Sequence, residues 1–168
     1  AIYGFTKMLR KLRADHQPSH WAVVFDLGAP RQRLAVLPSY KEHRPPTPPD
    51  LEAQLPAIRE ILAALRVPVV EQDGEEADDL IATLSARAAS AKMSVLIAST
   101  DKDFTQLVSP YIKLIRPGDK ADVVFDATAV QARYGLRPDQ MVDFFALTGD
   151  SVDNIRGVPG VGDKTATE

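Results

Sequence analysis

The apolar positions of the chain change their spacing several times, and each change marks a new element. Near the start, Ile2, Phe5, Leu9 and Leu12 recur at helical spacing and predict a helix. Trp21 to Phe25 is a short continuous apolar run, as expected of a buried strand. The later apolar runs and stripes predict strands at 67–70, 94–98, 111–115 and 123–125, and helices at 51–65, 75–89, 127–133 and 138–147.

Strands that alternate with helices predict an α/β domain with a mainly parallel sheet. Residues 31–50 interrupt this pattern with basic side chains followed by closely spaced prolines, so we expect an exposed, mobile segment with no packed element. Thr47 or Asp50 is expected to cap the helix that follows. In sheets of this type, functional sites lie beyond the carboxyl ends of the strands, where Asp26 and Asp101 are placed.

Acidic side chains gather in four short clusters along the chain. Carboxylate oxygens from several elements suit Mg²⁺ or Mn²⁺, and two such ions can stabilise the attacking and leaving oxygens of a phosphodiester displacement. Each cluster alone has a plainer explanation, as helix-dipole partners, a helix cap or turn acids. Their conjunction favours a metal site made of Asp26, Glu76, Asp78, Asp79, Asp101, Asp103, Asp150 and Asp153.

Composition and charge narrow the possible partners. The net charge of −3 is unusual for a protein that binds nucleic acid. With the eight proposed ligands set aside, 15 acidic side chains remain against 20 lysines and arginines, which is compatible with binding DNA phosphates. The chain has no cysteine, which excludes thiolate metal sites and fits a reducing cytoplasm. No apolar run approaches the roughly 18 residues of a membrane helix, so we expect no membrane partner.

Residues 157–166 form a glycine-rich turn that leads into a predicted helix. Glycines let a phosphate approach the backbone amides at a helix N-terminus, and a lysine adds positive charge. An ordinary turn is the plainer explanation. The spacing favours a helix-hairpin-helix that holds DNA phosphates independently of base sequence through Gly157, Gly160, Gly162 and Lys164.

Seven segments together carry a family resemblance. They are AIYGFTKML (1–9), VVFD (23–26), YKEHRPPTP (40–48), EADD (76–79), STDKDFTQL (99–107), YGLRPDQMVDFFALTGDSVDN (134–154) and GVPGVGDKTA (157–166). In this order and spacing, the chain resembles the 5′-3′ exonuclease (5′-nuclease) domain of bacterial DNA polymerase I and the flap endonuclease family. The resemblance implies a PIN-like α/β nuclease domain over 1–135, with a helical arch at about 36–50, and a small helix-hairpin-helix subdomain over 136–168.

The resemblance also implies a function. It is that of a divalent-metal-dependent 5′-3′ exonuclease and flap endonuclease that acts on flapped, nicked or branched DNA in replication and repair. The eight carboxylates match the family's ligands for two metal ions, Mg²⁺ or Mn²⁺, and the glycine hairpin matches a segment that can carry K⁺. Lys41 and Arg44 match basic residues that contact the scissile phosphate, and Arg33 and Tyr40 are further DNA-binding candidates; for Tyr40, packing is an equal alternative. We expect a monomer in the bacterial cytoplasm, associated with the nucleoid.

One departure and two rival functions remain open. Family members begin with a strand and an Asp-Gly pair that this sequence does not show, so we expect 1–168 to be part of a longer chain, with its first strand missing and its hairpin region truncated. Loss of that strand should expose Val23, Val24, Leu96 and Ile97. The rivals are a PIN-type ribonuclease, which usually lacks the arch and the hairpin, and a non-catalytic module that binds DNA of a particular structure.

Overall fold

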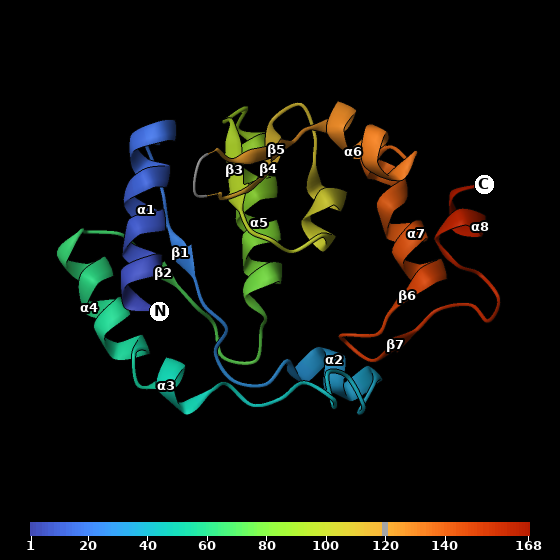
Figure 1. The fold of residues 1–168 in the computed structure, drawn as a ribbon, viewed down its shortest axis with the longest axis horizontal. Helices are drawn as coiled ribbons and strands as arrows, with labels where there is room; N and C mark the ends of the chain where they lie inside the picture. The colour runs from blue at the N-terminus through green and yellow to red at the C-terminus, as the bar shows by residue number, and fades with distance from the viewer. Residues whose placement is uncertain (119–120) are drawn as a thin grey trace. The chain divides into compact units, whose positions relative to one another are not determined.

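The computed structural model of the chain describes residues 1–118 and 121–168 (Figure 1). The described chain divides into two compact units. The first unit comprises residues 1–30 and 45–80, and the second comprises residues 31–44 and 81–168. Each unit is built around its own hydrophobic core.

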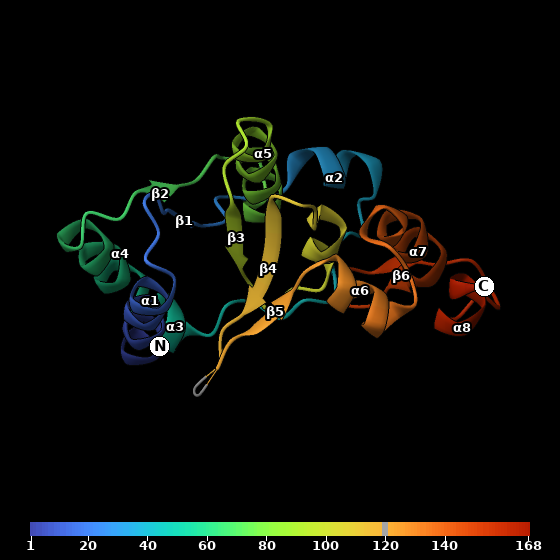
Figure 2. The ribbon, with the colours of Figure 1, turned by 90° about the horizontal axis from the view of Figure 1, so that it is seen from above.

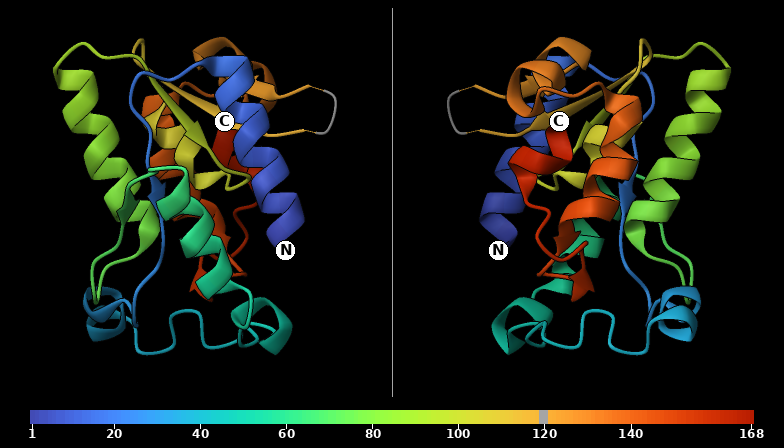
Figure 3. Two further views of the ribbon diagram at one scale, coloured as in Figure 1. Left: turned by 90° about the vertical axis from the view of Figure 1, so that its left-hand side faces the viewer. Right: turned by 90° about the vertical axis from the view of Figure 1, so that its right-hand side faces the viewer.

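The first unit packs two helices beside a short parallel strand pair. Helix α1 (Ile2–His16) lies alongside helix α4 (Leu55–Ala64), as Figure 3 shows. Strand β1 (Val23–Val24) pairs in parallel with strand β2 (Val69–Val70). The helical spacing of the apolar residues in α1 turns one stripe inward, and the buried core of the unit consists of Leu9, Ile58, Leu62 and Val67.

The second unit is built on a three-stranded sheet, shown in Figure 2. Strand β4 (Ile112–Arg116) lies in the centre, parallel to β3 (Val95–Ala98) and antiparallel to β5 (Val123–Phe125). Helix α5 (Ala77–Ser90) begins in the first unit and contributes Ile81 and Ala89 to the core of the second. Leu114 and Ile115 of the central strand point to opposite faces of the sheet and are almost completely buried, so both faces are covered at this strand.

The rest of the second unit is helical apart from one small hairpin. Its remaining elements are α2 (Arg31–Val36), η1 (Asp103–Leu107), α6 (Ala127–Tyr134), η2 (Pro138–Gln140), α7 (Met141–Thr148), β6 (Gly149–Asp150), β7 (Ile155–Arg156) and α8 (Asp163–Thr167). Asp126 caps α6 by accepting the N–H of Ala129 at 2.9 Å, and Gly135 ends that helix in the left-handed conformation. Strands β6 and β7 pair antiparallel and hold the turn at 151–154.

The structure confirms the α/β class and corrects four details of the predicted elements. Residues 31–50 contain α2 and part of α3 (Pro49–Glu52), where no packed element was expected. Pro30 and Pro38 flank α2, and the intervening residues are helix formers. The helix predicted over 51–65 is divided between α3 and α4 because Pro56 lies in the first turn of α4, where its missing N–H is tolerated.

The other two corrections concern the α3 cap and the apolar strand residues. Pro48, rather than Thr47 or Asp50, occupies the position before α3 and provides no side-chain cap. Strand β1 has two residues, both only partly buried, instead of the five in the apolar run. Leu96 is 44% exposed, as expected, whereas Ile97 is 4% exposed. Successive strand residues point to opposite faces, and the face that carries Ile97 is covered by the core.

Candidate active site

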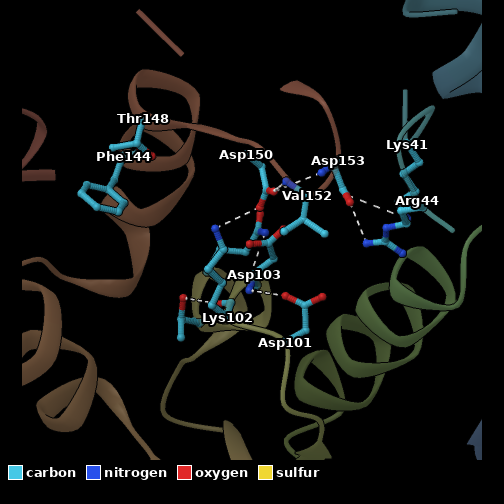
Figure 4. Close-up of polar contacts among 12 residues, drawn as sticks. Lys41, Arg44, Asp101, Lys102, Asp103, Phe144, Thr148, Asp150, Val152 and Asp153 are labelled. Atoms are coloured by element: carbon cyan, nitrogen blue, oxygen red, sulfur yellow. Dashed lines mark hydrogen bonds and ion pairs between the residues drawn. The ribbon is translucent and has the colours of Figure 1, made fainter. Parts of the chain in front are cut away.

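An open pocket of about 690 Å³ in the second unit collects four of the predicted metal ligands. Asp101 and Asp103 reach it from the segment that follows β3, and Asp150 and Asp153 from the turn between β6 and β7. Two segments about fifty residues apart in sequence therefore supply carboxylates to one cavity, and Figure 4 shows the side chains that surround it.

Asp101 shapes the first of these two segments. One of its carboxylate oxygens accepts the N–H of Asp103 at 2.9 Å, and its own N–H donates to Ser99 Oγ at 3.1 Å. The hydrogen bond from the N–H of Asp103 gives Asp101 a cap-like role, which is the plainer explanation for an acid at the start of a helix. Asp101 also lines the pocket, so its local role is compatible with the predicted role as a metal ligand.

Asp150 organises the second segment in the same way. Its Oδ1 accepts the N–H groups of Val152 at 2.7 Å and Asp153 at 3.2 Å, which fixes the turn. Behind this turn, the backbone at Gly149 passes close to that of Gly157, and Gly149 has a φ of 73°. A side chain at Gly149 would collide with the backbone at Gly157, and one at Gly157 would collide with the backbone at Thr148, so both positions require glycine for packing.

Cations of the chain itself contact two of the four carboxylates. Lys102 Nζ lies 2.9 Å from Asp150 Oδ2. Arg44 Nη2 lies 2.6 Å from Asp153 Oδ1, and Lys41 Nζ lies 3.9 Å from Asp153 Oδ2. The two basic residues predicted to contact the scissile phosphate are thus attached to the acidic pocket through Asp153, as Figure 4 shows.

The segment 39–44 is tied to the acidic turn by hydrogen bonds as well as charge. The hydroxyl of Tyr40 donates to Asp153 Oδ2 at 3.1 Å, and the backbone N–H of Lys41 donates to the carbonyl of Asp153 at 3.0 Å. The side-chain amide of Asn154 donates to the carbonyl of Ser39 at 2.8 Å. Tyr40 is 7% exposed, with the Arg33 guanidinium 5.9 Å from its ring centre, so packing accounts for its position.

Burial and neighbouring charges shift the pKa values of the pocket in opposite directions. Burial, together with the nearby carboxylate of Asp101, raises the pKa of Asp103 above its usual range. Burial also acts to raise the pKa of Asp150, but the hydrogen bond from Lys102 and those from the turn outweigh it, and the pKa of Asp150 is lowered. The pKa of Lys102 is raised, because its pairing with Asp150 outweighs the effect of its burial. Repulsion between clustered carboxylates predicts a raised pKa for several of them; this prediction is confirmed for Asp103 and is wrong for Asp150.

The donor chemistry of the pocket suits a hard divalent cation. Four carboxylates line it, and Mg²⁺ and Mn²⁺ prefer oxygen ligands. Among the residues that the structure describes, no three acidic or histidine side chains lie close enough together to form a ready-made metal cage. Asp150 and Asp153 instead form ion pairs with Lys102 and Arg44.

The other four predicted ligands lie in the first unit. Asp26 follows β1, and its Oδ1 accepts the N–H of Ala77, the first residue of α5, at 2.8 Å. Glu76 directly precedes α5 and is 6% exposed, although it is acidic. Asp78 and Asp79 lie in the first turn of α5, where carboxylates also offset the helix dipole. The convergence of all eight carboxylates on one cavity stays a prediction.

The glycine hairpin leads into α8, as the sequence predicts. Gly162 is the N-cap residue of α8, and Lys164 lies in the first turn of that helix. Gly160 has a φ of 82°, and a Cβ added at Gly160 or at Gly162 would meet no atom within 4 Å. The backbone at these two glycines is therefore open to an approaching group, whereas Gly157 is packed against the end of α7.

The sequence analysis missed four charged residues that line the pocket, which are Lys102, Arg116, Arg133 and Asp163. Lys102 stands between Asp101 and Asp103 and pairs with Asp150 across the pocket. A lysine inside an acidic motif indicates an ion pair with a carboxylate, but the sequence does not show which carboxylate it contacts.

Among the described residues, no helix is long and apolar enough to cross a membrane.

Comparisons with known proteins agree with this architecture. A family model described as 5′-3′ exonuclease, N-terminal resolvase-like domain, matches residues 1–135, and one described as 5′-3′ exonuclease, C-terminal SAM fold, matches residues 136–168. The chain is 44% identical to the DNA polymerase I of Bacillus caldotenax, covering 100% of this chain and 19% of the polymerase. It is 42% identical to a 5′-3′ exonuclease of Aquifex aeolicus, covering 99% of this chain and 57% of the exonuclease.

Solved structures show the same fold at lower identity. A structure of T5 5′-exonuclease with bound zinc ions has a TM-score of 0.80 at 22% identity, covering 99% of this chain and 65% of that one. The catalytic core of Rad2 in complex with DNA substrate has a TM-score of 0.63 at 21% identity, covering 99% of this chain and 52% of that one. The chain therefore spans a part of each of these proteins, and about a fifth of the polymerase.

Proposed function

The chain belongs to the 5′-3′ exonuclease family, and on that premise we propose that it hydrolyses DNA phosphodiester bonds as a divalent-metal-dependent 5′-3′ exonuclease and flap endonuclease. The observation that carries the proposal is the pocket, in which four carboxylates from two separate segments lie beside Lys41 and Arg44. Metal-assisted phosphodiester hydrolysis has two requirements: acidic oxygens that bind metal ions, and basic groups beside them that bind a phosphate. The polymerase relative supports a role in DNA replication and repair within a longer DNA polymerase I-type chain.

The metal would be Mg²⁺ or Mn²⁺, with two ions per site. Bound there, it would activate water and stabilise the departing oxygen. Asp101, Asp103, Asp150 and Asp153 would hold it, together with Asp26, Glu76, Asp78 and Asp79. The solved T5 5′-exonuclease with divalent metal ions supports this assignment by its fold. Carbonyl oxygens of the glycine hairpin are proposed to carry K⁺.

Lys41 and Arg44 would act on the phosphate itself. Their cationic groups lie at Asp153, on the rim of the cavity, and can turn from that carboxylate toward a phosphate oxygen. Positive charge held there stabilises the charge that develops on the phosphoryl oxygens in the transition state. In this proposal, Asp153 keeps the side chains of Lys41 and Arg44 beside the scissile phosphate.

The partner would be DNA with a 5′ flap, a nick or a branch. Gly157, Gly160, Gly162 and Lys164 would hold the duplex through its phosphates, and Arg33 and Tyr40 belong to the segment that leads to Lys41. The open backbone at Gly160 and Gly162 supports this contact, because a phosphate needs unobstructed amide groups. The protein would work as a monomer in the bacterial cytoplasm, associated with the nucleoid.

A cleavage assay on matched substrates tests the proposal. The full chain is incubated with a 5′-labelled flap DNA, with the same structure made of RNA, and with linear duplex DNA, each with Mg²⁺ or EDTA. We expect Mg²⁺-dependent cleavage of the flap DNA near its junction, and less cleavage of RNA. Preferential cleavage of RNA would identify a PIN-type ribonuclease, and tight flap binding without cleavage would identify a non-catalytic DNA-binding module. Either result would overturn the proposal.

A further inference from the structure

Lys102 has a position that the proposed reaction does not require. It stands between two pocket carboxylates in sequence and holds a third, Asp150, through an ion pair of 2.9 Å (Figure 4). Its ammonium also lies 5.2 Å from the ring centre of Phe145 on α7, so the lysine contacts both the turn that carries Asp150 and the helix that precedes this turn.

The two oxygens of Asp150 have separate tasks. Oδ1 accepts the N–H groups of Val152 and Asp153 and is thereby fixed by the turn. Oδ2 holds the ammonium of Lys102. One oxygen of the carboxylate is therefore fixed by hydrogen bonds from the backbone, and the other forms the ion pair with Lys102.

Asp153 differs from Asp150 in this respect. Arg44 contacts its Oδ1, while Tyr40 and Lys41 contact its Oδ2, so both of its oxygens are engaged by the segment 39–44. A cation that enters the pocket would displace several contacts at Asp153, whereas at Asp150 Oδ2 it would displace the ion pair with Lys102. The side chain of Lys102 is 44% exposed and that of Asp150 is 18% exposed, so the lysine can move into water at little cost while the carboxylate still needs a positive partner.

We infer that Lys102 is an exchangeable counter-ion of the pocket: its ammonium occupies Asp150 Oδ2 and leaves that oxygen when a divalent metal ion binds. The inference rests on the proposed metal site and adds to it a residue that sets metal affinity without being a ligand. Each metal ion that binds Asp150 has to break one ion pair, and the affinity is reduced by the strength of that pair.

Removing the competing charge should tighten metal binding. In Lys102→Met, the side chain keeps most of its length and its contact with Phe145 but carries no charge, and Mn²⁺ should bind about fivefold more tightly, as expected for a partly exposed pair. Lys102→Arg keeps the charge and should stay near the wild-type affinity. Lys113→Met removes an exposed lysine from β4, outside the pocket, and is the matched control.

The experiment titrates Mn²⁺ into the full chain without DNA, using calorimetry and the electron paramagnetic resonance signal of free Mn²⁺. Thermal unfolding of each variant confirms that it is folded. In an Asp150→Asn background, Lys102→Met should no longer change the affinity, because the shared oxygen has lost its charge. If the wild type binds Mn²⁺ and Lys102→Met binds it equally tightly or more weakly, the role of Lys102 alone is overturned. Wild-type protein that shows no saturable binding would overturn the metal site itself, and this inference with it.

Discussion

Replacing Asp153 with alanine should release the segment 39–44 from the acidic turn. Asp153→Ala removes the charged hydrogen bond from Arg44 and the hydrogen bond from the Tyr40 hydroxyl, and it leaves the backbone hydrogen bond from Lys41 in place. Tyr40 is buried, so its hydroxyl would lose a partner in a position where water has little access.

The expected cost follows from these contacts. The loss of one hydrogen bond by a buried hydroxyl costs about 1 to 2 kcal/mol. The ion pair with Arg44, whose side chain is 46% exposed, adds about 0.5 to 1 kcal/mol after allowance for solvent screening. Asp153→Ala should therefore lower the free energy of unfolding by about 1.5 to 3 kcal/mol. Tyr40→Phe should lower it by about 1 kcal/mol and Arg44→Ala by less than that.

A double-mutant cycle in urea isolates the contact between Asp153 and Arg44. If the ion pair is formed in solution, Arg44→Ala should cost about 0.5 to 1 kcal/mol less in the Asp153→Ala background than in the wild type. Additive costs for the two substitutions would refute the reasoning, because they would mean that Arg44 does not interact with Asp153.

Three further substitutions test the pocket and the hairpin. Asp103→Asn should raise the melting temperature near neutral pH, because the raised pKa of Asp103 means that its ionised form destabilises the folded state at pH values above the pKa of this group in the unfolded chain. The gain in melting temperature should shrink as the pH falls toward the usual pKa range of an aspartate. Melting curves from pH 7 to pH 4 measure it, and a gain that is constant or grows as the pH falls would contradict the prediction. Lys41→Ala should slow single-turnover cleavage far more than it weakens DNA binding, if its charge acts in the transition state; equal losses in the two measurements would argue against that role. Gly162→Val places a side chain where the structure has open space, so the melting temperature should change little while affinity for duplexes of any sequence falls; unchanged affinity would remove the hairpin from the DNA-binding surface.

The sequence predicted the elements best where the apolar pattern was uninterrupted. The strands β3, β4 and β5 are found within one residue of their predicted bounds, and the apolar stripe from Ile2 to Leu12 lies within α1. Prediction failed where prolines decided the backbone: Pro56 divides one expected helix, and Pro30 and Pro38 flank a helix that was expected to be loop. These effects depend on where each proline falls within a turn of helix, which the apolar pattern does not record.

The candidate site was predictable in its composition but not in its pairing. Acids after strands and in a late turn indicated the pocket, and Asp101, Asp103, Asp150 and Asp153 do line it. The contacts of Lys102 with Asp150 and of Arg44 with Asp153 join residues that are 48 and 109 positions apart. Periodicity carries no information about which charges meet across such separations, so the ion pairs and the opposite pKa shifts of Asp103 and Asp150 required the structure.

The most direct test of a metal-dependent nuclease centred on this pocket is the single-turnover cleavage rate of Asp150→Asn. The measurement uses a 5′-labelled flap DNA with saturating Mg²⁺, beside the wild type and Asp139→Asn, an exposed acid outside the pocket. We expect the wild type and Asp139→Asn to cleave at similar rates that EDTA abolishes, and Asp150→Asn to be slower by about a hundredfold or more, as for the loss of one electrostatic group from a reaction centre. A wild-type rate from Asp150→Asn, or wild-type cleavage that continues in EDTA, would contradict the account.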